Sequence, residues 1–270
     1  MRTSLFLAVF LLLAAGAQPS AIPAQNEAQS NQQKARAIID RMIQALGGPA
    51  YLGVHDSFSK GRYGRFSKDV EVGFSLYYRW WQWPDKERYD LGEDRMVAQL
   101  YLDDNIKEIT YKGARDVDPL KENNTDMRLK IPRRHYTLER VIREWLNQPG
   151  TILIYEGQTL ANNRMADKVT VINAKNEAVT LLVSPDSHLP LEKQFTIRNP
   201  QFGDHDEVSE LFDNWRMVQG VNTPYTVQVL YNKHLLRQDS IMSITYNEPP
   251  PDYYFTPVLI AQRETQPKKH

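Results

Sequence analysis

The stretch "DVEVGFSLYYRWWQWPDKERYDL", residues 69–91, indicates a long β-strand, because its side chains alternate between two sets. Successive side chains of a β-strand point to opposite faces of the sheet. One set is wholly apolar or aromatic: Val70, Val72, Phe74, Leu76, Tyr78 and Trp80. The other set is mixed: Glu71, Gly73, Ser75, Tyr77, Arg79 and Trp81. We predict that the apolar set lines a concave, covered face and that Tyr77, Arg79 and Trp81 lie outside.

The same two-residue period continues along the chain from about residue 58 to residue 247. Met96, Ala98, Leu100 and Leu102 repeat the apolar alternation on a following strand, which favours an antiparallel sheet of ten or eleven strands. Residues 114–131 are charged and irregular, which predicts a loop. The tail carries Tyr253, Tyr254 and Phe255 among prolines, which favours an apolar plug that folds back.

Two segments have helical spacing instead. The first begins at a capping box of Ser30 and Gln33 and ends at Gly47-Gly48. Its apolar stripe consists of Ala35, Ile38, Ile39, Met42, Ile43 and Leu46. The second covers residues 135–147, with Leu138, Val141, Ile142, Trp145 and Leu146 on one face. The sequence therefore predicts an α+β fold: one strongly curved antiparallel sheet of about eleven strands, covered on its concave face by helices.

The ends of the chain have compositions of their own. Residues 1–17 combine Arg2 with a short apolar run and a small-x-small site, which predicts an export signal peptide. Residues 18–30 are polar and contain prolines, which favours a flexible leader, and residues 261–270 favour a disordered tail. One domain is predicted over residues 31–260.

Charge and cysteine content exclude several classes of protein. The 33 basic and 33 acidic residues cancel, so we predict no nucleic-acid partner. The absence of cysteine excludes disulfides and thiolate sites, and Ala17 stands where a lipoprotein signal would have its lipidated cysteine. We therefore predict a monomer that is free in the periplasm.

No catalytic motif is present. The sequence lacks H-E-x-x-H, G-x-S-x-G, a P-loop and a dinucleotide fingerprint, and the "GDHDE" cluster at residues 203–207 is typical of a solvated loop. We predict that the protein is not an enzyme and has no cofactor, no metal site and no catalytic residue. Hydrolysis by two carboxylates that are distant in sequence stays open.

The apolar residues have two interpretations. They pack tightly under the helices, or they line a cavity that holds acyl chains, in which each buried methylene contributes about 0.8 kcal/mol. A cavity of at least about 300 Å³ favours the second interpretation. The candidate lipid-binding residues are Phe74, Leu76, Tyr78, Trp80, Met96, Leu100, Leu138, Ile142 and Trp145.

Five segments in order resemble the LolA-like superfamily of periplasmic lipoprotein carriers. After the first helix come "WPDKERYDL" (83–91) and "VAQLYLDDNIKEITYKG" (97–113). "SPDSHLPLEKQF" (184–195) and "FDNWRMVQGVNTPYTVQVLYN" (212–232) are similar to the C-terminal half of the family. The resemblance implies an unclosed β-barrel with helices as a lid.

The resemblance also implies a function. It implies a carrier of lipoprotein or lipid cargo in outer-membrane lipoprotein sorting, with sorting proteins of the inner and outer membranes as partners. In the carrier an arginine directly before the proline holds the lid, but this chain has Trp83 there. Arg79 and Arg88 are alternatives for that role. A sensing or protein-interaction module on the same scaffold, with Tyr77, Arg79 and Trp81 at its interface, is the alternative function.

Overall fold

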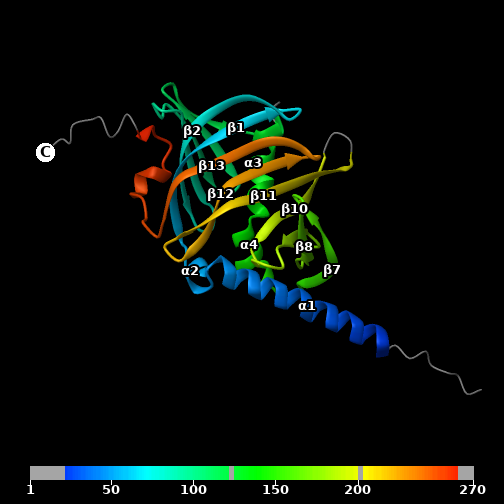
Figure 1. The fold of residues 1–270 in the computed structure, drawn as a ribbon. Coiled ribbons are helices and arrows are strands. Elements are labelled where there is room, and N and C mark those ends of the chain that lie inside the picture. Colours follow the sequence, from blue (N-terminus) through cyan, green and yellow to red (C-terminus); the bar gives the residue numbers. More distant parts are fainter. Residues whose placement is uncertain (1–21, 122–124, 200–202, 261–270) are drawn as a thin grey trace, which may run out of the picture.

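The computed structural model describes residues 22–121, 125–199 and 203–260, which form one antiparallel sheet and several helical elements (Figure 1). The sheet runs in the order β6-β5-β4-β3-β2-β1-β13-β12-β11-β10-β9-β8-β7, so two meanders meet where β1 pairs with β13. Its strands are β1 (Asp56–Ser67), β2 (Val70–Gln82), β3 (Lys86–Leu91), β4 (Val97–Leu102), β5 (Asn105–Thr110), β6 (Gly113–Val117), β7 (Ile152–Ala161), β8 (Arg164–Ile172), β9 (Ala178–Val183), β10 (Pro190–Arg198), β11 (His205–Val218), β12 (Val221–Tyr231) and β13 (His234–Tyr246). Since β6 and β7 are the two end strands, the sheet does not close.

The sheet has 13 strands, whereas the sequence predicted about eleven. β6 lies in the segment 114–131 that was predicted to be a loop, and so does most of α3 (Thr125–His135). The loop prediction is therefore wrong for these two elements. The apolar pattern of the sequence does not reveal α3, because many of its residues are charged and they include Pro132, so it lacks the apolar stripe of an ordinary amphipathic helix. Its charges find partners inside the molecule rather than in water.

The helical elements differ from the prediction mainly at their ends. They are α1 (Ile22–Leu46), α2 (Pro49–Leu52), η1 (Pro119–Lys121), α3, α4 (Leu138–Arg143), η2 (Trp145–Asn147) and η3 (Asp252–Phe255). The predicted helix over residues 135–147 is interrupted, because His135 ends α3 and Thr137 caps α4 by accepting a hydrogen bond from Arg140 N.

α1 begins at Ile22, so the capping box at Ser30 is wrong and residues 22–30 of the predicted leader are helical. Its first turns are rich in alanine, glutamine and glutamate, which favour helix, and Pro23 is tolerated in a first turn. The predicted end is confirmed: Gly47 has φ 126°, and Gly48 N donates to Ile43 O at 2.9 Å.

α1 also protects the end of the sheet formed by β7. The Asn31 side-chain amide donates to Tyr155 O at 2.7 Å and accepts from Tyr155 N at 2.8 Å. Lys34 Nζ lies 3.9 Å from the centre of the Tyr155 ring. An exposed strand edge invites pairing with another chain, so these contacts cover a surface that is otherwise prone to association.

The main core lies between the helices and the β7–β12 half of the sheet. The predicted stripe of α1 is confirmed, with Ile43 partly buried and the rest buried. On α4 and η2, Val141, Ile142 and Trp145 are buried in the same cluster. The Tyr136 ring stacks on Phe195 at 4.6 Å and meets Trp145 edge to face at 5.8 Å.

The alternation of β2 is confirmed from Phe74 to Trp81, but the two faces are reversed. Tyr77, Arg79 and Trp81 line a cavity on the side of α3 and α4. Trp80, on the other face, stacks on Phe58 at 4.8 Å and contacts Tyr254 of the C-terminal segment at 4.7 Å. Phe74 is 62 % exposed. The prediction that the apolar set of β2 lines the concave face is therefore wrong. Alternation along a strand separates two faces, but it does not indicate which face the helices contact.

The C-terminal segment covers part of this outer face, as the red segment of Figure 1 shows. Phe255 and Leu259 pack on Ala98, Leu100 and Ile109, so the predicted folding back of the tail is confirmed, on the face opposite α3 and α4. Arg88 fixes the segment by donating to Tyr254 O and Thr256 O, both at 3.2 Å, and to Val258 O at 2.8 Å.

We expect Gly61→Ala to destabilise the protein by about 2 kcal/mol, the range of overpacked cores. A Cβ at this strand position would lie 2.5 Å from Ser240 O and 2.6 Å from the Tyr77 ring. The matched control is Gly73→Ala, whose Cβ meets only the end of the Arg65 side chain at 3.2 Å. Urea unfolding checks both variants, and equal midpoints would contradict the expectation.

Candidate functional site

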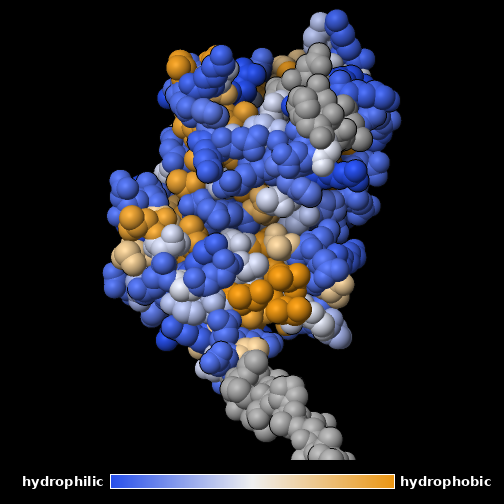
Figure 2. Space-filling model, turned by 90° about the vertical axis from the view of Figure 1, so that its right-hand side faces the viewer, coloured by the Kyte–Doolittle hydropathy of each residue, from blue (hydrophilic) through white to orange (hydrophobic). Residues whose placement is uncertain are grey.

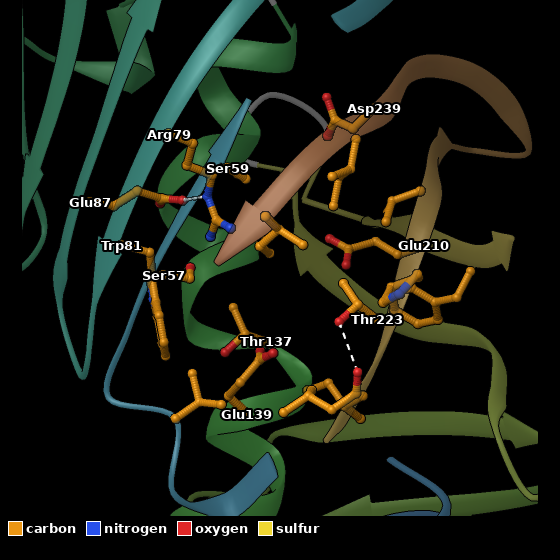
Figure 3. A pocket seen from close by; sticks show the side chains of 18 of the residues that line it. Ser57, Ser59, Arg79, Trp81, Glu87, Thr137, Glu139, Glu210, Thr223 and Asp239 are labelled. Carbon is orange, nitrogen blue, oxygen red and sulfur yellow. Dashed lines mark hydrogen bonds and ion pairs between the residues drawn. The ribbon is translucent and has the colours of Figure 1, made fainter. Parts of the chain in front are cut away.

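A cavity of about 270 Å³ lies between the helices and the curved sheet (Figure 3). β1, β2 and β3 supply one wall, through residues such as Ser59, Trp81 and Glu87. β11, β12 and β13 supply the opposite wall, through residues such as Glu210, Thr223 and Asp239. Figure 3 shows Thr137 and Glu139 of α4 facing the same space. The cavity therefore brings together both halves of the sheet and the helices.

The lining changes character along the helices. α3 contributes Lys130, Arg133 and Arg134, which are all basic. α1, α2 and α4 contribute core residues and, from α4, the charged Glu139 and Arg143, and the strands add aromatic rings to that part: Leu46, Tyr51, Leu138, Trp81, Trp215 and Tyr246. The cavity is thus amphipathic, with a basic wall at α3 and a largely apolar and aromatic wall, which also carries Glu139 and Arg143, toward α4.

Ion pairs join α3 to three separate strands. Arg134 Nη1 lies 2.6 Å from Glu87 Oε2, and Arg133 Nε lies 2.8 Å from Glu210 Oε1. Asp126 Oδ2 lies 3.6 Å from Arg237 Nη1 on β13. Charged pairs this deeply buried are costly to break, because the remaining partner is left without compensation. They therefore fix the position of α3 over the sheet.

The carboxylates of these pairs stay ionised. Burial by itself would raise the pKa of Glu87, but Arg79 and Arg134 outweigh it and lower that pKa to about 2. Burial likewise opposes ionisation of Glu210, and Lys193 and Arg133 lower its pKa to about 2. A general acid needs a pKa near the working pH. These two groups are consequently suited to ion pairing rather than to proton transfer.

Solved structures share the fold over most of this chain. A DUF1329 family protein from Desulfovibrio piger has a TM-score of 0.58 at 12 % identity, over 83 % of this chain and 97 % of that one. A Vibrio parahaemolyticus domain assigned by name to outer membrane lipoprotein sorting has 0.52 at 10 % identity, over 85 % and 97 %. A LolA superfamily protein from Nitrosomonas europaea has 0.52 at 9 % identity, over 82 % and 96 %. The chain has a LolA-like fold. No protein-family model matches the sequence, and no curated protein matches it.

In this LolA-like fold the arginines that hold the helices come from the helices themselves. Arg140 of α4 ion-pairs with Asp85, directly after Pro84. Arg143 donates to Val54 O and Tyr51 O, both at 2.7 Å, and its guanidinium lies 5.0 Å from the Trp83 ring centre. Trp83, the residue before the proline, thus provides an aromatic ring against which Arg143 of α4 lies.

Neither Arg79 nor Arg88, the two arginines predicted as alternatives, holds the helices directly. Arg79 ion-pairs with Glu87, the carboxylate that also accepts from Arg134 of α3, so its link to the helix is indirect. Arg88 lies on the opposite face, where Arg88 Nε donates to Asp90 Oδ1 at 2.6 Å. The alternation of side chains along the strands explains the difference. Arg79 is opposite Tyr89 on the cavity face, whereas Arg88 is opposite Trp80 on the outer face.

The predicted lipid-binding residues are divided among four places. Phe74, Leu76, Tyr78 and Trp80 lie on the outer face of β2. Met96 and Leu100 lie beneath the C-terminal segment. Ile142 and Trp145 are in the main core, and Leu138 lines the cavity. Of the nine, Leu138 is the one that the structure brings to the cavity.

The sequence analysis missed most of the cavity wall. Tyr77, Arg79 and Trp81 were assigned to the outside, and α3 was assigned to a loop. One signal was available for α3, because Lys130, Arg133 and Arg134 recur at spacings of three and four, as on a helix face. Nothing comparable in the sequence indicates which face of β2 meets that helix.

The face of the molecule shown in Figure 2 is mostly hydrophilic with several apolar patches. On β7 and β8 the exposed apolar side chains are Ile152, Ile154, Leu160 and Met165. Within the described residues, no three side chains of the metal-ligating types gather into a possible ion site. In the same part of the chain, no helix has the length and apolar character that crossing a membrane requires.

Proposed function

We propose that this protein binds an amphiphilic, lipid-like ligand in the cavity between the helices and the sheet. The observation that carries the proposal is the lining of that cavity, which is apolar toward Leu138, Trp81 and Trp215 and basic at α3. An apolar chain gains free energy from the first wall, and a polar end finds charged groups at the second. The LolA-like fold of the chain supports a carrier rather than a catalyst.

We further propose that α1, α3 and α4 cover the concave face of the sheet and control entry. The cavity of about 270 Å³ is smaller than the volume of about 300 Å³ expected of an acyl-chain cavity, which is the lower end of the range of about 300–1,000 Å³ for small-molecule sites. A long acyl chain therefore requires the helices to move away from the sheet, against the ion pairs of Arg134 and Arg133.

The cellular setting is part of the same proposal. The predicted signal peptide, residues 1–17, lies outside the described residues, and with Ala17 in place of a cysteine it supports an unanchored protein in the periplasm. Lipoproteins or free lipids are the proposed cargo, and sorting proteins of the inner and outer membranes are the proposed partners.

The direct test is native mass spectrometry of protein purified from the periplasm, together with titration of a fluorescent fatty acid. We expect bound lipid and saturable uptake. Ser59→Phe fills the cavity from β1 and should weaken uptake at least tenfold, whereas Lys60→Phe, on the opposite face of the same strand, should bind like the unmodified protein. Thermal melting checks that both variants are folded. No bound lipid and no uptake would refute the proposal.

The two alternative functions have less support. Tyr77, Arg79 and Trp81, the surface predicted for an interaction module, line the interior, so they are not available to a protein partner. For a hydrolase, Glu87 and Glu210 are each held ionised by two basic side chains. Neither group is suited to act as the acid of a carboxylate pair.

A further inference from the structure

The cavity has more basic than acidic side chains in its lining. The basic residues are Arg79, Lys130, Arg133, Arg134, Arg143 and Lys193, and the acidic residues are Glu87, Glu139, Glu210 and Asp239. Burial makes uncompensated charge costly. The lining therefore favours a ligand that brings negative charge.

The least well compensated charge of the lining is that of Lys130, whose ion pair with Asp126 is a long contact. Its Nζ lies 3.7 Å from Asp126 Oδ2, beyond hydrogen-bonding distance, and 5.1 Å from the centre of the Tyr89 ring. Across residues 22–121, 125–199 and 203–260, no acceptor is hydrogen-bonded to this ammonium group, although the residue is only 9 % exposed. Asp126 is shared, since Arg237 Nη1 also lies 3.6 Å from its Oδ2.

The other basic residues of the lining contrast with Lys130. Lys193 Nζ lies 2.9 Å from Glu210 Oε2, and Arg133 lies 2.8 Å from the same carboxylate. Arg79 and Arg134 share Glu87. Arg143 donates to two backbone carbonyls. Lys130 is therefore the position at which one more anionic group would complete the pairing.

The electrostatic environment of Lys130 agrees with this geometry. Burial lowers the pKa of Lys130 to about 8, and the neighbouring Arg237 adds to the effect, while Asp126 opposes it. Arg237 and Arg133 thus disfavour the charged ammonium group. The carboxylates of Asp126 and Asp239 compensate only part of that effect and of the burial. An anion beside Nζ would stabilise the charged form of the lysine.

We propose that Lys130 binds the anionic group of the ligand, a carboxylate or a phosphate, with the apolar chain extending toward Leu138 and Trp81. This inference rests on the proposed function, because it places one end of the same ligand. A fatty acid and a lipid phosphate present the same chemistry at this position, charged oxygen acceptors for a buried ammonium group.

The test compares ligands of one chain length by the fluorescence of the tryptophans, of which Trp81 and Trp215 line the cavity. The ligands are decanoate, decyl phosphate, decanol and inorganic phosphate. We expect the two anionic amphiphiles to bind at least tenfold more tightly than decanol. Lys130→Met should remove that difference and leave decanol binding unchanged, and Lys130→Arg should retain it. Lys130→Met removes one cationic partner of Asp126 and leaves Arg237, so we expect the variant to stay folded, which thermal melting checks.

The outcomes separate the two proposals. Equal affinities for decanoate, decyl phosphate and decanol would overturn the role of Lys130 and leave the proposed function standing. A preference that survives in Lys130→Met would also overturn it. Inorganic phosphate that binds as tightly as decyl phosphate would identify a free-anion site and overturn the placement of a lipid end group. If none of the amphiphiles binds, the proposed function itself fails.

Discussion

Glu210→Gln should lower the free energy of unfolding by about 3–5 kcal/mol, the cost of breaking a buried ion pair from one side. Glu210 accepts from Arg133 of α3 and ion-pairs with Lys193 of β10, and Lys193 is only 1 % exposed. The amide leaves both cations without a charge partner inside the protein. Urea unfolding followed by tryptophan fluorescence measures the change.

The effect of this substitution should depend on pH. The pKa of Glu210 is about 2 in the folded protein and has an ordinary value of 4.5. Its folded-state value is lowered, so its contribution is fully present above pH 4.5 and is lost as the pH falls toward about 2. The difference between the variant and the unmodified protein should therefore shrink over that window.

Two further variants control this prediction. Asp40→Asn breaks the Arg36–Asp40 pair, which is half exposed on α1, and should change the stability by no more than about 0.5 kcal/mol. In the double variant Glu210→Met, Lys193→Met, both members of one pair are removed, so part of the stability should return. A loss below about 1 kcal/mol for Glu210→Gln would show that α3 is not held by this pair.

Arg88→Met should release the C-terminal segment from the outer face of the sheet and cost at least about 4 kcal/mol, since three hydrogen bonds from a charged group are lost and each contributes about 1.5–3 kcal/mol. Arg88 is fully buried and donates to three carbonyls of residues 254–258. Asp90 keeps Arg95 as a partner at 3.1 Å, so the loss falls mainly on the segment.

Hydrogen exchange and tryptophan fluorescence report this release. The amides of Tyr254, Thr256 and Val258 should exchange faster, and Trp80 should shift to longer emission wavelengths as its contact with Tyr254 is lost. Arg62→Met, which breaks an exposed pair with Glu71 on the same face, should leave both signals unchanged. Unaltered exchange in Arg88→Met would mean that apolar packing of Phe255 and Leu259 is sufficient.

Local patterns were sufficient for the elements of the fold. The two-residue period predicted nearly all strands, and the stripe from Ala35 to Leu46 predicted the buried face of α1. They were insufficient for α3, because that helix buries charges, and the partners that make such burial possible are distant in sequence. Arg134 and Glu87 are 47 residues apart, and Arg133 and Glu210 are 77 apart.

Local sequence is sufficient for the alternation of β2, the two sets of residues on its faces and the order of most strands, but not for β6 and α3. Which face of β2 meets the helices depends on contacts between segments that are distant in the chain. Alternation has the same form on both faces, and an apolar set is buried equally well by a C-terminal segment or by helices. Here Trp80 is covered by Tyr254, while Tyr77, Arg79 and Trp81 face α3 and α4 and form the cavity.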